Sequence, residues 1–229
     1  MDIPLDKSRN TNLVIIPSRS RPESIARAIN SLKENSVISD FCVALDDDDE
    51  VNYPRLDGVI YEVNPRLRMN KTLNLVANKY ADKYETIFFM GDDHNPTTKA
   101  WDETLYGPIK SIGYGLSYGN DLLQGQALAT AVMMSTNIIK AIGYMAPPEL
   151  IHLFMDNFWM RIGSTIKSLW YFDAVIIEHL HYINGKATQD EQYKEVNSGE
   201  VFEHDQKAFA KYIEEQFDND INKLKAELL

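Results

Sequence analysis

Acidic and imidazole side chains follow two apolar runs of the sequence, and together they could bind a metal ion. Asp92, Asp93 and His94 follow the first run, and His179 and His181 follow the second. In an extended strand, side chains two positions apart point the same way, so the two later histidines can face one ion. Carboxylates suit Mg²⁺ or Mn²⁺, and an imidazole favours Mn²⁺. We predict that Asp93, His179 and His181 hold such an ion; the competing interpretation of Gly-Asp-Asp is a simple turn.

A run of four aspartates, Asp46 to Asp49, follows another apolar stretch. Carboxylate oxygens there can accept hydrogen bonds from a ribose or from a base N–H. We predict this role for Asp46 and Asp48. A solvated acidic loop is the competing interpretation.

Five basic side chains could bind an anionic ligand: Arg19, Arg21, Arg66, Arg68 and Lys71. Charge-assisted hydrogen bonds from guanidinium groups suit a diphosphate. The competing interpretation, side chains that lie along the surface with their heads in water, would account for about two of the five.

Asp156 lies among aromatic residues in a predicted helix. An unpaired carboxylate on an apolar helix costs free energy, and burial raises its pKa toward the range of a general base. We predict that Asp156 is a catalytic base. An ion pair with Arg161 is the alternative.

Short apolar runs and helical repeats alternate through the first part of the chain. The sequence predicts strands at residues 12–17, 41–45, 59–63 and 86–90, and helices that begin at Pro22 and span residues 70–80. This β-α-β-β-α-β order predicts an α/β fold with a mostly parallel central sheet flanked by helices. Ligands bind beyond the carboxyl ends of such strands, so the acidic and basic groups described above are expected to meet there.

The later chain is less regular. It predicts helices at residues 99–112, 136–142 and 150–163, strands at 127–135 and 169–177, and a polar connection at 184–200. A charged amphipathic helix is expected at residues 201–229. Residues 1–229 are expected to form a single domain.

Composition bounds the class of protein. The 229 residues carry a net charge of −11, and the single cysteine excludes an internal disulfide framework and a cysteine-rich zinc site. The charge argues against tight nonspecific nucleic-acid binding. The chain starts with no signal-peptide pattern and contains no apolar run of membrane-spanning length. We therefore expect a cytoplasmic protein (host cytoplasm if the source is viral) with no membrane partner.

The ordered motifs resemble those of nucleotide-sugar glycosyltransferases with the GT-A fold, in particular family 2-like members. The resemblance covers residues 12 to 182, and its motifs are residues 14–22, 44–47, 70–74, 88–94 and 156–163, with His179 and His181. One position departs from the family pattern. Gly91 stands where the Asp-x-Asp motif has its first aspartate, so Asp93 is the retained ligand.

The resemblance implies a Rossmann-like GT-A domain that moves a sugar from a nucleoside diphosphate sugar to an acceptor hydroxyl, with inversion. It implies Mn²⁺ or Mg²⁺ at Asp93, His179 and His181, and a base at Asp156. The implied donor-binding residues are Pro17, Ser18, Arg19, Arg21, Asp46, Asp48, Arg66, Asn70, Lys71 and Asp92. Residues 184–193, with Lys186, are expected to close over the donor. The acceptor class is open, and a modified nucleobase in DNA is among the candidates.

Two other functions compete with this one. A nucleotidyltransferase would share the strand order and the acidic metal site, but it normally has a glycine-rich loop after the first strand, and residues 17–22 contain no glycine. A non-catalytic nucleotide-sugar-binding module is compatible with the altered Asp-x-Asp motif.

Overall fold

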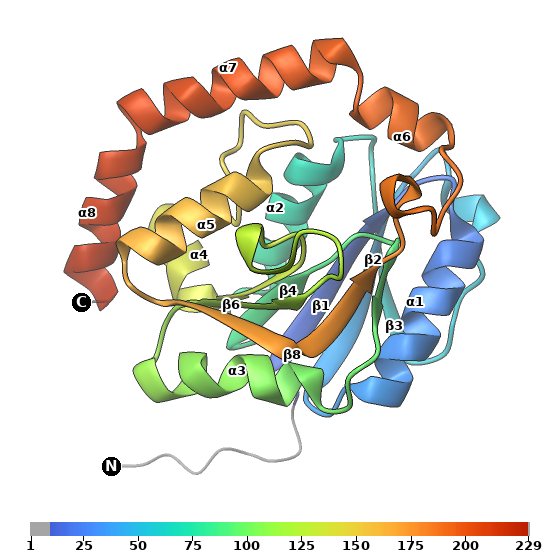
Figure 1. Cartoon of the computed structure of the whole chain (residues 1–229), viewed down its shortest axis with the longest axis horizontal. Helices are drawn as coiled ribbons and strands as arrows, with labels where there is room; N and C mark the ends of the chain where they lie inside the picture. The colour runs from blue at the N-terminus through green and yellow to red at the C-terminus, as the bar shows by residue number, and fades with distance from the viewer. Residues whose placement is uncertain (1–9, 229) are drawn as a thin grey trace.

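The computed structural model describes residues 10–228, and its centre is one eight-stranded sheet (Figure 1). The strand order is β3-β2-β1-β4-β7-β6-β8-β5. The strands are β1 (Asn12–Ser18), β2 (Ser39–Asp46), β3 (Val59–Asn64), β4 (Thr86–Phe89), β5 (His94–Pro96), β6 (Leu116–Asn120), β7 (Val132–Ser135) and β8 (Leu169–His179). β1 to β4 run parallel, as predicted, and β7 enters the sheet antiparallel to β4.

Helices cover both faces of the sheet. They are α1 (Pro22–Asn35), α2 (Met69–Tyr80), α3 (Trp101–Ile112), α4 (Thr136–Ile142), α5 (Met155–Thr165), α6 (Glu191–Val196), α7 (Gly199–Glu215) and α8 (Phe217–Leu228). α1 and α3 pack on one face; α2, α4, α5 and α8 pack on the other. Alternate residues of β1 enter the two cores, Leu13 one and Val14 the other, which explains why the strand is apolar without interruption.

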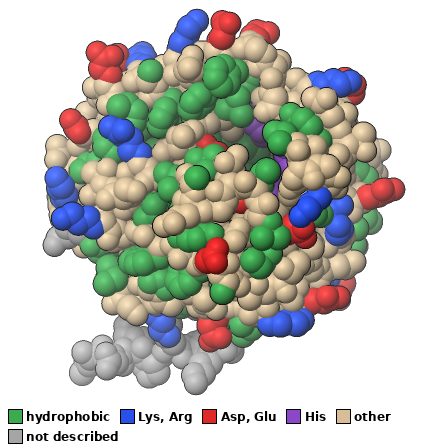
Figure 2. Space-filling model, in the orientation of Figure 1, with side chains coloured by type: hydrophobic (Ala, Val, Ile, Leu, Met, Phe, Trp, Pro, Cys, Tyr) green, Lys and Arg blue, Asp and Glu red, His purple; other side chains and the backbone are tan. Residues whose placement is uncertain are grey.

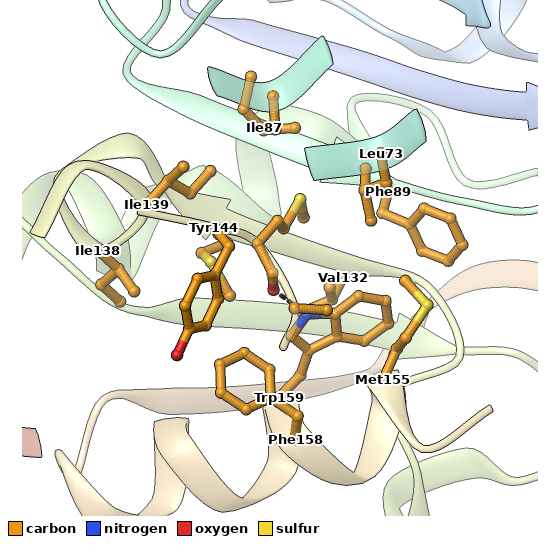
Figure 3. Close-up of a cluster of buried hydrophobic side chains, with 14 of the residues drawn as sticks. Leu73, Ile87, Phe89, Val132, Ile138, Ile139, Tyr144, Met155, Phe158 and Trp159 are labelled. Atoms are coloured by element: carbon orange, nitrogen blue, oxygen red, sulfur yellow. Dashed lines mark hydrogen bonds between the residues drawn. The ribbon is translucent and has the colours of Figure 1, made fainter. Parts of the chain in front are cut away.

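The larger core anchors α5 (Figure 3). Phe158 and Trp159 are buried against the sheet, and the Trp159 ring lies 5.2 Å from that of Phe89. The Trp159 indole N–H donates a hydrogen bond of 2.7 Å to the Met145 carbonyl, so its polar atom is satisfied. This packing fixes the helix whose first turn carries Asp156.

Several elements differ from the sequence prediction. The strand predicted at residues 127–135 begins only at Val132, and the short strand β5 was not predicted. The helix predicted from residue 150 begins at Met155, because the backbone N–H groups of residues 151–153 bind the carboxylate of Asp205 instead of forming a helical turn. The polar connection contains the short helix α6. The predicted C-terminal helix is two helices that part at Gln216, where the chain turns to pack α8 against α4 (Figure 1). Residues 1–9 and Leu229 of the predicted domain lie outside the described residues.

None of the helices within residues 10–228 is both long and apolar enough to cross a membrane.

Candidate functional site

A cavity of about 400 Å³ opens beside the carboxyl ends of β1, β2 and β4. Figure 2 shows it as a hollow with histidine side chains inside. Eleven of the predicted site residues line it: Pro17, Ser18, Arg19, Arg21, Asp46, Arg66, Asp92, Asp93, Asp156, His179 and His181. Asp48, Asn70 and Lys71 do not.

The candidate metal site consists of Asp93, His94 and His179, whose ligand atoms all lie within 4.8 Å of one another. Asp93 Oδ1 lies 3.2 Å from His94 Nδ1, and Asp93 Oδ2 lies 3.3 Å from His179 Nε2. The two imidazole rings stack at 4.1 Å. Strands β5 and β8 bring them together, because His94 and His179 are direct partners in that antiparallel pair.

His181 lies beside this site and not within the three-residue group. β8 ends at His179, so the i, i+2 register that predicted two facing histidines does not continue. The His181 ring centre is 4.9 Å from that of His179, and His181 Nδ1 accepts a hydrogen bond from the Ile183 N–H. Because Nδ1 of His181 is used in that bond, Nε2 is the ring nitrogen that remains to bind a metal ion or a substrate.

His94, and not His181, is the third residue of the candidate metal site. Its position directly after Asp93 is the feature of the sequence that indicates this role.

Hydrogen bonds and charges give the candidate metal site a defined protonation pattern. Burial opposes ionisation of Asp93, but hydrogen bonds from His179 and His94 hold its pKa well below the usual range. Burial also opposes the charge on His179, yet Asp121 and Asp93 raise its pKa to about 9. Burial raises the pKa of Asp92 to about 6, with help from the charge of Asp93. The carboxylates of Asp121 and Asp93 therefore favour the protonated form of His179.

Asp121 supports the two histidines and was not predicted from the sequence. One of its oxygens accepts hydrogen bonds from three backbone N–H groups of residues 123–125, and the other accepts one of 2.8 Å from Thr130. Thr130 Oγ1 lies 3.3 Å from His94 Nε2, and Asp121 Oδ2 lies 3.8 Å from His179 Nδ1. Such outer contacts orient metal-binding imidazoles.

The arginines near the mouth of the cavity are paired with carboxylates. Arg19 donates to Asp46 at 2.8 Å and to Asp48 at 2.6 and 3.0 Å. Arg21 donates to Asp92 at 3.1 Å and forms two bonds of 2.7 Å with Asp190. These are the bidentate geometries that guanidinium groups also form with phosphates.

The segment that contains α6 lies over this part of the cavity. Glu195 accepts hydrogen bonds from Arg66, at 2.6 Å, and from Arg68. Tyr193 packs its ring 4.1 Å from the Arg21 guanidinium and donates a 2.7 Å hydrogen bond to Asp93. The predicted closing segment, residues 184–193, therefore overlaps a segment that contacts both the arginines and the candidate metal site.

Of the three predicted donor-binding residues that do not line the cavity, two belong to α2. Asn70 is fully buried, and its side chain donates to the carbonyls of Pro147, at 2.6 Å, and Leu150, at 3.0 Å. It ties α2 to the loop before α5. Lys71 is exposed on α2.

Asp156 lines the cavity from the first turn of α5. Burial raises its pKa, although a hydrogen bond from the Asn157 N–H acts in the opposite direction. Arg161 does not neutralise it; that guanidinium lies 5.0 Å from the Phe217 ring. The carboxylate faces the same cavity as the candidate metal site.

No protein-family model matches the sequence, and no curated protein is similar to it. Solved structures do match. The mannosyltransferase PcManGT from Pyrobaculum calidifontis, in complex with GDP-Man and Mn²⁺, superposes with a TM-score of 0.56 and 9% identity, over 98% of this chain and 81% of that one. This chain has a GT-A-type fold.

Two further structures share the GT-A-type fold. TarS residues 1–349 of S. aureus match with a TM-score of 0.55 and 13% identity, over 90% of this chain and 75% of that one, and TarS has also been solved in complex with UDP. A CMP:2-keto-3-deoxy-manno-octonic acid synthetase complexed with CTP matches with a TM-score of 0.53 and 10% identity, over 73% of this chain and 90% of that one. The GT-A-type fold thus occurs in both glycosyltransferases and a nucleotidyltransferase, and these identities establish the fold alone.

Proposed function

We propose that this protein is a metal-dependent glycosyltransferase that moves a sugar, with inversion, from a nucleoside diphosphate sugar to an acceptor hydroxyl. One observation carries the proposal: the candidate metal site, paired arginines and the half-buried carboxylate of Asp156 share one cavity. A protein that only binds a nucleotide would not need a metal site, arginines and a carboxylate together in one cavity.

Asp93, His94 and His179 would hold Mn²⁺ or Mg²⁺, with His181 beside them. The mixed oxygen and nitrogen ligand set fits Mn²⁺ better. His179 must lose its proton to act as a ligand, so a bound cation takes the place of that positive charge. The ion would neutralise charge on the nucleoside diphosphate leaving group.

The donor would lie along the carboxyl ends of β1 and β2. Asp46 is next to the nucleoside pocket expected after Pro17, and Arg21 and Arg66 are within reach of a diphosphate at the mouth of the cavity. Asp190 and Glu195 hold these two arginines in the structure. Phosphate oxygens would take over those contacts when the donor binds.

Asp156 would act as the base. Its carboxylate takes the proton from the acceptor hydroxyl while the hydroxyl oxygen forms a bond to the anomeric carbon. The bond from that carbon to the diphosphate breaks and the electron pair leaves with the diphosphate. Partial burial raises the pKa of Asp156, which favours its action as a proton acceptor.

The segment of residues 184–193, including Lys186, is proposed to enclose the donor. Its position is held by Arg21 bound to Asp190, and by Lys186 bound to Glu178. Protection of this segment from proteolysis by nucleoside diphosphate and Mn²⁺ together would support that role. Unchanged cleavage would contradict it.

A nucleotidyltransferase is the second candidate, because one structure with the same fold has that activity. The two functions release different products. A glycosyltransferase releases a nucleoside diphosphate, whereas a nucleotidyltransferase consumes a triphosphate and releases pyrophosphate.

The test is a thermal-shift panel of UDP, GDP, CDP and ADP and their common sugars, with and without Mn²⁺, followed by product analysis. Stabilisation by one nucleoside diphosphate only with metal, lost in Asp93→Asn and retained in the exposed control Asp82→Asn, is expected. Metal-independent binding, or pyrophosphate as product, would refute the proposal. Donor binding without turnover on any acceptor would indicate a binding module.

A further inference from the structure

Asp205 is a fully buried carboxylate in α7 that binds the loop in front of α5. Its oxygens accept three consecutive backbone hydrogen bonds, from Ile151 at 2.9 Å, His152 at 2.9 Å and Leu153 at 2.7 Å. His204 Nδ1 lies 2.9 Å from the same carboxylate. Charge-assisted bonds to several adjacent N–H groups hold a loop in one conformation more firmly than neutral bonds do.

This loop leads directly into the catalytic region of the proposed function. Phe154, the next residue, has φ +64°, a left-handed conformation that is costly for a side chain with a Cβ. Such backbone persists where surrounding contacts enforce it, and it is often found at functional sites. The loop is also tied to α2, because the Asn70 N–H donates to the Ile151 carbonyl at 3.2 Å.

Ile151, His152 and Leu153 all line the cavity, and His152 carries the only polar side chain of the three. Its Nδ1 is buried and has no hydrogen-bond partner among residues 10–228. Burial lowers the pKa of His152 to about 4, so the ring is neutral at physiological pH. A neutral imidazole has one N–H donor and one nitrogen acceptor, which matches the donor and acceptor character of a sugar hydroxyl.

An unpartnered buried nitrogen is costly, and native proteins seldom keep one that no ligand or water satisfies. The backbone N–H groups of residues 151–153 are all bonded to Asp205, whereas Nδ1 of His152, a cavity-lining side chain, has no partner among the described residues.

We propose that His152 binds a hydroxyl group of the sugar substrate and that Asp205, from α7, is the residue that positions it. This rests on the proposed glycosyltransferase function. Helix α7 lies outside residues 12–182, whose sequence motifs resemble those of glycosyltransferases, and on this proposal it supports the site.

The test uses the full chain and four variants: His152→Ala, His152→Asn, Asp205→Asn and, as a control, Asp220→Asn. Asp220 is also fully buried, in α8, but its carboxylate binds Tyr144, Tyr212 and Gln216 and does not contact the loop. The measurements are affinity for UDP and GDP with Mn²⁺, release of nucleoside diphosphate from UDP-glucose, UDP-galactose and GDP-mannose, and amide hydrogen exchange.

His152→Ala is expected to lower nucleoside diphosphate release by roughly tenfold, the equivalent of one neutral hydrogen bond. UDP and GDP lack the transferred sugar that His152 is proposed to contact. The affinity of His152→Ala for them should therefore stay within about twofold of the wild-type affinity, because a tenfold loss corresponds to a whole hydrogen bond. His152→Asn, whose amide can place a polar atom near the Nδ1 position, should recover part of the rate. An unchanged rate in His152→Ala would overturn the substrate contact.

Asp205→Asn is expected to lower the same release and to speed amide exchange at residues 151–153. Asp220→Asn should lower thermal stability without either effect. If amide exchange at residues 151–153 is as slow in Asp205→Asn as in wild type, the positioning role is overturned, whether or not the variant turns over substrate. Failure of the wild-type protein to bind UDP or GDP with Mn²⁺ would instead refute the proposed function.

Discussion

The phenol of Tyr193 donates a 2.7 Å hydrogen bond to Asp93 Oδ2, the same oxygen that lies 3.3 Å from His179 Nε2. The two residues of this bond are one hundred positions apart in the sequence. The contact joins the segment over the cavity to the candidate metal site, so we expect metal binding and the position of that segment to be coupled.

This contact gives the first prediction. Tyr193→Phe removes an outer hydrogen bond that orients a metal-binding carboxylate, and such losses weaken metal affinity by about tenfold or more. Titration calorimetry with MnCl₂ measures the effect. Tyr182→Phe is the matched control, because the Tyr182 ring packs against Tyr193 at 4.9 Å but has no bond to Asp93 among the described contacts. Equal Mn²⁺ affinity in wild type and Tyr193→Phe would contradict the coupling.

The second prediction concerns the carboxylates that occupy the arginines. In the double variant Asp190→Asn, Glu195→Gln, Arg21 and Arg66 each lose one charged partner and become more available to phosphates. We expect UDP or GDP with Mn²⁺ to bind about threefold to tenfold more tightly, an effect of charge-assisted bonds that weakens with added salt.

The control for this double variant is Glu191→Gln. Glu191 lies on the same helix but pairs with Lys194. The affinity of Glu191→Gln for UDP or GDP with Mn²⁺ should therefore match that of wild type. Weaker binding in the double variant would mean that the carboxylates hold the arginines in place for the donor.

The third prediction is a trade-off at Asp156. Burial raises its folded-state pKa above the ordinary value of 3.8, so the ionised form destabilises the fold. The favourable contribution of the protonated carboxyl is complete below pH 3.8 and is lost as the pH rises through the folded-state pKa. Asp156→Asn should therefore melt at a higher temperature than wild type at pH 7, a difference that disappears near pH 3.8.

The same substitution should abolish sugar transfer while UDP or GDP with Mn²⁺ still binds. Thermal melts across this pH range and a transfer assay measure the two effects, with the exposed Asp82→Asn as control. Normal transfer by Asp156→Asn would show that another group is the base.

The fourth prediction tests the core that supports α5. Trp159→Ala leaves a cavity beside Phe89 and removes the donor to the Met145 carbonyl. The expected loss in the free energy of unfolding is about 3–5 kcal/mol, measured by urea denaturation. Leu75→Ala, at an exposed apolar position of α2, should change stability by less than about 0.5 kcal/mol. A loss for Trp159→Ala as small as that of the control would mean that α5 is held by other contacts.

The sequence alone determined the fold class and much of the cavity wall. Local periodicity sufficed for β1 to β4, because strands buried on both faces are apolar throughout and the chain turns polar where each strand ends. The side chains that follow these strands, Arg19, Asp46 and Asp93 among them, meet because parallel strands end at one edge of the sheet.

Only the tertiary structure decided which groups complete the site. His94 lies beside His179 because β5 pairs with β8, and β5 has only three residues and therefore no periodicity that predicts it. Tyr193 reaches the cavity from the C-terminal part of the chain, and Asp205 binds the loop that lines it, through contacts that no local pattern encodes. Periodicity reports which face of an element is buried, but it does not report the partner of a single polar side chain, since that depends on segments that meet only when the chain folds.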